Sequence, residues 1–183
     1  MNPTTATALG TVFKKAGLKE TAVLLALAWL IPFAIHLLPW SEARPLGAYL
    51  IPVFWTAFVA VYFYGAAVGL IVGLAGPVLN LVVTGLPAWR FLGVMSIELV
   101  IFVLVLTGAV RRAPQFFLLA PLGYLVAIAA STGLQAVTTL FGAIGQPGPH
   151  FLRSLAGSLA GLVVLTAINI ALVRFYPKSP RGK

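Results

Sequence analysis

The segment Gly93-Val-Met-Ser-Ile-Glu-Leu-Val-Ile-Phe-Val-Leu-Val-Leu106 decides the class of this protein. It is an apolar run that contains a single ionisable side chain, Glu98. An ionised side chain in hydrocarbon costs roughly 2.5 kcal/mol or more, so it is seldom kept without a role. The chain has three acidic residues, and Glu98 is the only one inside an apolar run. The segment therefore predicts a membrane-spanning helix that carries a functional carboxylate.

The composition of the whole chain supports this interpretation. Of its 183 residues, 61% are hydrophobic and 8% are charged, and the mean hydropathy is +1.05. No soluble core of this size needs so much apolar surface, and long uncharged runs indicate membrane spans. Cysteine is absent, which excludes disulfides, thiolate metal sites and cysteine nucleophiles. We therefore predict an all-α integral membrane protein.

The net charge of +9 has a simple explanation in such a protein. In a soluble chain it would suggest nucleic-acid binding. Here Lys and Arg cluster at the ends of apolar runs, where they fix topology and meet anionic lipid headgroups. The first apolar run is long enough to span, and no small-residue cleavage site follows it, so we expect no cleaved signal peptide.

Six apolar runs predict six transmembrane helices. Their expected ranges are 18–38, 47–64, 66–83, 91–110, 116–141 and 151–176. Residues 1–17 form an N-terminal segment, residues 18–176 the six-helix transmembrane domain, and residues 177–183 a basic tail. Tyr62 and Tyr64 suit a membrane interface. Gly69 and Gly73 share one helix face and favour close approach of another helix, and Gly157 and Gly161 repeat this spacing.

The distribution of basic residues predicts the orientation. Six spans place both termini on one side of the membrane. The basic residues on that side are Lys14, Lys15, Lys19, Arg111, Arg112, Arg174, Lys178, Arg181 and Lys183. Those on the other side are Arg44, Arg90 and Arg153. Because cytoplasmic loops carry the excess of Lys and Arg, both termini are expected in the cytoplasm.

In this orientation the unusual side chains gather in the outer third of the membrane. Glu98 lies about 10 Å below the outer end of its span, at 1.5 Å per residue. The candidates for contact with a small molecule are Glu98, Gln135, Asn80, Trp89, Arg90, Trp40, His150 and Arg153. Together they predict a polar, aromatic-walled cavity that opens outward and is closed beneath by apolar packing.

Each candidate also has a purely structural interpretation. Glu98 could form an internal ion pair with Arg90 or Arg153. The remaining polar residues of the spans could be hydrogen-bonding links between helices, as such residues usually are; these are Gln135, Asn80, Ser131 and Thr132. The tryptophans could be interface anchors. For Asn169, toward the inner end of the last span, helix–helix bonding is the expected use.

An enzymatic function is not expected. The chain has no Asp, no glycine-rich phosphate loop, no His-Glu metal motif and no paired carboxylates. No second His or carboxylate stands at ligand spacing from His36 or His150, so neither a metal site nor another cofactor is expected.

Two stretches carry a resemblance to a known family. The first span contains Ala22-Val-Leu-Leu-Ala26, an AxxxA motif whose small residues make a smooth helix face. The aromatic second span passes directly into Tyr64-Gly-Ala-Ala-Val-Gly-Leu-Ile-Val-Gly-Leu-Ala-Gly76, a glycine-rich third span. With six short spans and inward termini, the chain resembles the S-component, the substrate-binding membrane subunit of energy-coupling-factor vitamin transporters.

The resemblance implies a fold, a function and partners. It implies an S-component-like bundle in a bacterial or archaeal cell membrane that captures a vitamin-sized solute from outside. Ala22 and Ala26 would dock on the coupling subunit of an ATPase module. The chain has no nucleotide motif, so any ATP hydrolysis would lie on partner chains. The implied solute contacts are Trp40, Arg44, Trp89, Arg90, His150, Arg153, Glu98 and Gln135.

Two questions stay open at this point. The solute could be a thiamin-like cation, suited to Glu98 and tryptophans, or cobalamin, or an anion held by the outer arginines. The alternative function is a small self-associating channel or a structural membrane protein with an internal Glu98–Arg153 ion pair.

Overall fold

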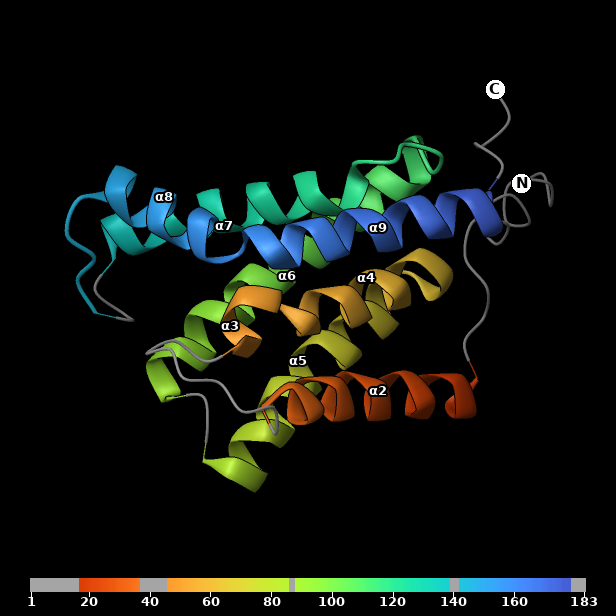
Figure 1. Cartoon of the computed structure of the whole chain (residues 1–183), viewed down its shortest axis with the longest axis horizontal. Coiled ribbons are helices and arrows are strands. Elements are labelled where there is room, and N and C mark those ends of the chain that lie inside the picture. Colours follow the sequence, from red (N-terminus) through yellow and green to blue (C-terminus); the bar gives the residue numbers. More distant parts are fainter. Residues whose placement is uncertain (1–16, 37–45, 86–87, 139–141, 179–183) are drawn as a thin grey trace, which may run out of the picture.

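The computed structural model describes residues 17–36, 46–85, 88–138 and 142–178, and every regular element in them is a helix. Figure 1 shows their arrangement. The helices are α2 (Leu18–His36), α3 (Leu46–Leu50), α4 (Pro52–Tyr64), α5 (Ala66–Thr84), α6 (Trp89–Arg112), α7 (Leu119–Val137), α8 (Pro147–Gly157) and α9 (Leu159–Phe175).

Five stretches are long and apolar enough to cross a membrane. They are Leu18–Ile35, Leu46–Tyr64, Ala66–Val83, Trp89–Arg112 and Leu119–Val137. A sixth results if α8 and α9, which meet at a bend of 60°, are counted as one broken span. The predicted all-α class is confirmed, and the described helices are those of a multi-pass membrane protein.

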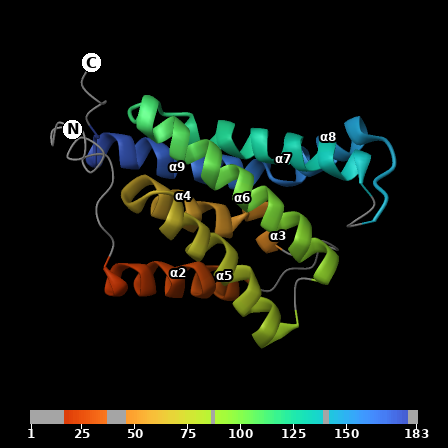
Figure 2. The same ribbon diagram turned by 180° about the vertical axis from the view of Figure 1, so that it is seen from behind.

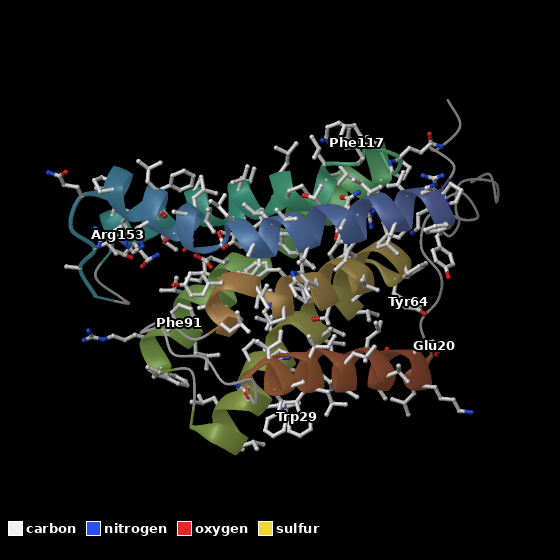
Figure 3. All side chains as sticks on the ribbon, viewed as in Figure 1. Glu20, Trp29, Tyr64, Phe91, Phe117 and Arg153 are labelled. Atoms are coloured by element: carbon white, nitrogen blue, oxygen red, sulfur yellow. The ribbon has the colours of Figure 1, made fainter. Side chains whose placement is uncertain are left out.

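The bundle has two ends, which Figures 1 and 2 show from opposite sides. The beginning of α2, the α4–α5 turn, the α6–α7 connection and the end of α9 lie together at what we call the basal end. Glu20, Tyr64 and Phe117 mark it in Figure 3, and Phe91 and Arg153 mark the opposite, distal end. The helix α2 lies along one edge of the bundle against α5 and α4, while α7, α8 and α9 form the other side.

Glycines allow the central helices to approach closely. The predicted tight turn between the second and third spans is confirmed at Gly65, whose φ is 85° and whose N–H donates to the Val61 carbonyl at 2.9 Å. A Cβ on Gly73 would lie 3.5 Å from the Ala57 Cβ and 3.6 Å from Leu99 Cδ2. The predicted glycine face of α5 is therefore confirmed as the surface on which α4 and α6 pack.

Aromatic rings fill the centre of the bundle. Phe54 of α4 makes edge-to-face contacts with Phe102 of α6 and Tyr124 of α7, at centroid distances of 5.1 and 4.9 Å. Such contacts add roughly 0.5–1.5 kcal/mol each beyond the burial of their area. They fix α6 between α4 and α7, and this position of α6 determines which way Glu98 points.

The second span differs from the prediction, because it is two helices rather than one. Pro52 has no N–H to donate to the carbonyl of Ala48, and its ring disfavours helical geometry at the preceding residue. Ile51 accordingly adopts φ 47° and ψ 46°, and the helix breaks there into α3 and α4.

The last span also differs from the prediction. A continuous helix over 151–176 after a loop over 142–150 was expected, but the helix begins at Pro147, a residue suited to the first turn. It breaks at Ser158, whose hydroxyl donates to the carbonyls of Ser154 and Leu155 at 3.0 and 3.1 Å. Such local side-chain bonds compete with regular helix geometry.

Tyr62, in the last turn of α4, is shielded by protein. Its side chain has no exposed area, and its hydroxyl donates a hydrogen bond to the Tyr176 carbonyl at 2.8 Å. The phenol therefore joins the end of α4 to the segment that follows α9.

Candidate functional site

Glu98 faces α7. Its neighbours Leu99 and Phe102 are fully buried, Leu99 against α5 and Phe102 against α4. Because successive residues of a helix are turned by about 100°, Glu98 points to the side of α6 next to Leu99. There its carboxylate faces the Ser131 hydroxyl of α7 and interacts with it.

Ser131 connects Glu98 to a second polar group. Gln135, one turn further along α7, donates from Nε2 to Ser131 Oγ at 3.2 Å and to the Ser131 carbonyl at 3.4 Å. A serine hydroxyl can donate one hydrogen bond while it accepts another, so it can donate to the carboxylate and accept from the amide. We call Glu98, Ser131 and Gln135 the polar cluster.

The polar cluster is shielded from solvent. Ser131 is 1% exposed and Gln135 is 8% exposed, while Glu98 is half-buried. Among the described residues no Lys or Arg forms an ion pair with Glu98. The carboxylate and the Gln135 carbonyl oxygen are both hydrogen-bond acceptors, so the cluster presents acceptor chemistry to a molecule that brings donors or positive charge.

The cluster lies in the distal half of the bundle. Glu98 is about 14 Å from Trp89 along the helix axis at 1.5 Å per residue. Trp89 begins α6 at the distal end, and Gln135 lies in the last turn of α7, which ends there. The expected convergence of Glu98 and Gln135 near one end of the bundle is therefore found.

The other candidates lie apart from this cluster. Asn80 is buried on α5, beyond the glycine face. Trp89 is 77% exposed, and Arg90 is exposed with its Nη1 3.3 Å from the position a Cβ on Gly142 would take. His150 is half-buried and Arg153 exposed, both on α8. Trp40 and Arg44 lie outside the described residues.

The position of Ser131 between Glu98 and Gln135 was not predicted, because this serine was expected only as a possible link between helices. The signal that could have found it is the spacing of Ser131 and Gln135, which places both on one face of the helix. Within the described ranges, no three His, Asp or Glu side chains gather as a metal site would require.

The proposed docking residues lie on the outer face of α2. Ala22 and Ala26 are exposed, whereas Ala28 is fully buried against α5, where a Cβ on Gly76 would lie 3.2 Å from the Ala28 carbonyl oxygen. The helix therefore packs on the bundle through one side and presents the AxxxA motif on the other.

No protein-family model, no curated protein and no solved structure matches the chain.

Proposed function

We propose that this chain is the solute-binding membrane subunit of an importer of the energy-coupling-factor type. The observation that carries the proposal is the polar cluster. A carboxylate inside an apolar bundle is costly, and among the described residues it interacts with the buried Ser131, which in turn accepts from Gln135, and with no basic residue. Such a group is suited to a ligand that supplies the missing donors.

The charge distribution supports an outward-facing site. The described basic residues of the basal end are Lys19, Arg111, Arg112, Arg174 and Lys178. Those of the distal end are Arg90 and Arg153. By the positive-inside rule the basal end would be cytoplasmic, and the polar cluster would lie in the outer half of the membrane.

The chemistry of the cluster favours a solute with positive charge or several hydrogen-bond donors. Glu98 would pair with the charge, and Gln135 would orient the molecule through its amide. A thiamin-like cation meets this requirement most directly among vitamin-sized molecules. Cobalamin, whose side-chain amides are donors, is the second candidate.

The partner in this proposal is an ATPase module in a bacterial or archaeal cell membrane. The chain has no phosphate-binding loop, so the energy for uptake would come from partner chains. The exposed Ala22 and Ala26 give α2 a smooth outer face on which a helix of the coupling subunit can pack.

The alternative, a structural protein or channel with a Glu98–Arg153 ion pair, has less support. Arg153 is exposed on α8, and the contact of Glu98 in the described residues is with Ser131.

Substitution on α2 tests the importer proposal. Ala26→Trp places a bulky ring on the docking face, and we expect it to abolish both energised uptake and co-purification with an ATPase module. Ala167→Trp is the matched control, because Ala167 is an exposed alanine on α9. Equal uptake and co-purification for the two variants would contradict docking through α2.

A further inference from the structure

Two spans of the bundle are broken in their distal halves. At the first break, Ile51 has φ 47°, and it is the one residue other than glycine with positive φ among the described residues. A β-branched side chain in the left-handed region is strained. Strain of this kind persists where the surrounding structure enforces it, and it is common at parts that move.

The second break faces the first. Gly161, in the first turn of α9 after the bend at Ser158, packs on the last residue of α3. A Cβ on Gly161 would lie 2.6 Å from the Leu50 carbonyl oxygen and 2.7 Å from its carbon. Because these are backbone atoms, a side chain larger than hydrogen would force α3 and α9 apart. The two breaks therefore form one contact that requires glycine.

The half-helix α8 is attached to the bundle by one apolar side. Phe151 and Leu155 pack against the core, while Leu152 and Arg153 are exposed. The hydroxyl of Ser158 bonds to carbonyls of α8 itself, those of Ser154 and Leu155. A half-helix held by apolar contact across a bend of 60° can swing as a unit about that bend.

The same half-helix lies beside the polar cluster. It packs against α7, and both Figures 1 and 2 show the two side by side at the distal end. Ser131 and Gln135 occupy the distal half of α7 and are buried. Movement of α8 away from α7 would therefore uncover this part of α7.

We propose that the paired breaks at Ile51 and Ser158 are one hinge, and that α3 and α8 form its moving gate over the polar cluster. With Gly161 seated on Leu50 the gate is closed. Separation of α3 from α9 lets α8 leave α7 and exposes Ser131 and Gln135 to the outer side. Naming a solute as the molecule that passes rests on the proposed function, whereas the hinge itself does not.

The absence of cysteine from the chain makes this motion measurable. Ser131→Cys introduces a single thiol, and its reaction rate with a membrane-impermeant maleimide is followed in lipid nanodiscs. We expect slow labelling when this is the only change. Adding Gly161→Ala, which pushes α3 away from α9, should raise the labelling rate about fivefold or more. A factor of this size is typical of the coupling between two parts of a protein. Gly108→Ala is the control, because a Cβ there would meet nothing within 4 Å, and it should leave the rate unchanged.

A second variant acts without adding volume. Ile51→Gly removes the strain at the first break, since glycine adopts positive φ without strain. The closed arrangement is then stabilised, and the labelling rate should fall below that of Ser131→Cys alone. If Gly161→Ala does not fold, Ile51→Gly decides. Fast labelling of Ser131→Cys alone, or rates for both hinge variants equal to that of Gly108→Ala, would overturn the gate.

Failure of the gate and failure of the proposed function give different results. Solute binding together with unresponsive labelling means that the site is right and the hinge is wrong. Labelling that responds to the hinge variants, with no solute found on the purified protein, means that the hinge is right and the proposed function is wrong.

Discussion

The side chain of Asn169 in α9 closes the first turn of α7 by accepting a hydrogen bond from the Ala120 N–H at 2.8 Å. Its Nδ2 donates to the Phe116 carbonyl at 3.3 Å, and the side chain has no exposed area. The first N–H groups of a helix have no partner within the helix, and inside a membrane water cannot supply one. The expectation that Asn169 bonds two helices is confirmed.

Replacing this side chain should destabilise the bundle. Asn169→Leu leaves the Ala120 N–H buried without its acceptor, and we expect a loss of about 1–3 kcal/mol in the free energy of unfolding. The measurement is chemical unfolding in detergent. Thr166→Val is the control, because the Thr166 hydroxyl donates, within the described part of the chain, to the Leu162 carbonyl of its own helix at 2.7 Å. Equal losses in the free energy of unfolding would show that the bond between α9 and α7 stabilises the protein no more than a bond within one helix.

Replacing glycine by alanine should have opposite effects on stability at the packed face of α5 and at an open position on α6. A Cβ on Gly69 would collide with Val61 Cγ2 and lie 3.3 Å from Val103 Cγ1, so Gly69→Ala should cost about 1–3 kcal/mol. Gly108→Ala meets open space and should gain up to about 1 kcal/mol from helix propensity. Thermal unfolding of both variants in one detergent tests this difference. A stabilising Gly69→Ala would mean that α4 and α6 do not pack on this face.

The basal end has a contact that predicts protease sensitivity. The Tyr62 hydroxyl binds the Tyr176 carbonyl, and Lys178 donates to the Tyr62 carbonyl and lies over its ring. Tyr62→Phe removes the first bond, worth about 0.5–1.5 kcal/mol. We expect trypsin to cleave after Lys178 faster in this variant than in Tyr64→Phe. The same cleavage rate in both would show that the phenol does not hold the segment.

The polar cluster predicts that the Ser131 hydroxyl contributes to solute binding. Ser131→Ala removes the hydroxyl that lies between Glu98 and Gln135, so the carboxylate loses its partner on α7. We expect solute affinity to fall about tenfold, which corresponds to about 1.4 kcal/mol. Binding to the purified variant, measured by calorimetry once the solute is known, checks this. Thr132→Val, next in sequence and also buried, should bind normally.

The sequence predicted those parts of the structure that depend on long-range hydropathy or helix spacing. Glu98 and Gln135 were expected near one another because both lie in the same part of antiparallel spans. The breaks were missed because apolar runs continue through Ile51 and Ser158, although Ile51-Pro52 is a recognisable signal for a break. The burial of Tyr62 and the exposure of Trp89 could not be predicted, since they depend on which helices become neighbours.

Contact between Glu98 and a solute can be measured by native mass spectrometry of the gently purified protein, which detects a small molecule that stays bound to the chain. Glu98→Gln keeps the shape and removes the charge, and Glu20→Gln removes the same charge from an exposed position in the first turn of α2. We predict a bound solute on the wild-type protein and on Glu20→Gln, and at least about a tenfold loss of affinity for Glu98→Gln. Equal solute occupancy in the two variants, or a folded wild-type protein that carries and binds none of the candidate solutes, would show that Glu98 is not a solute contact.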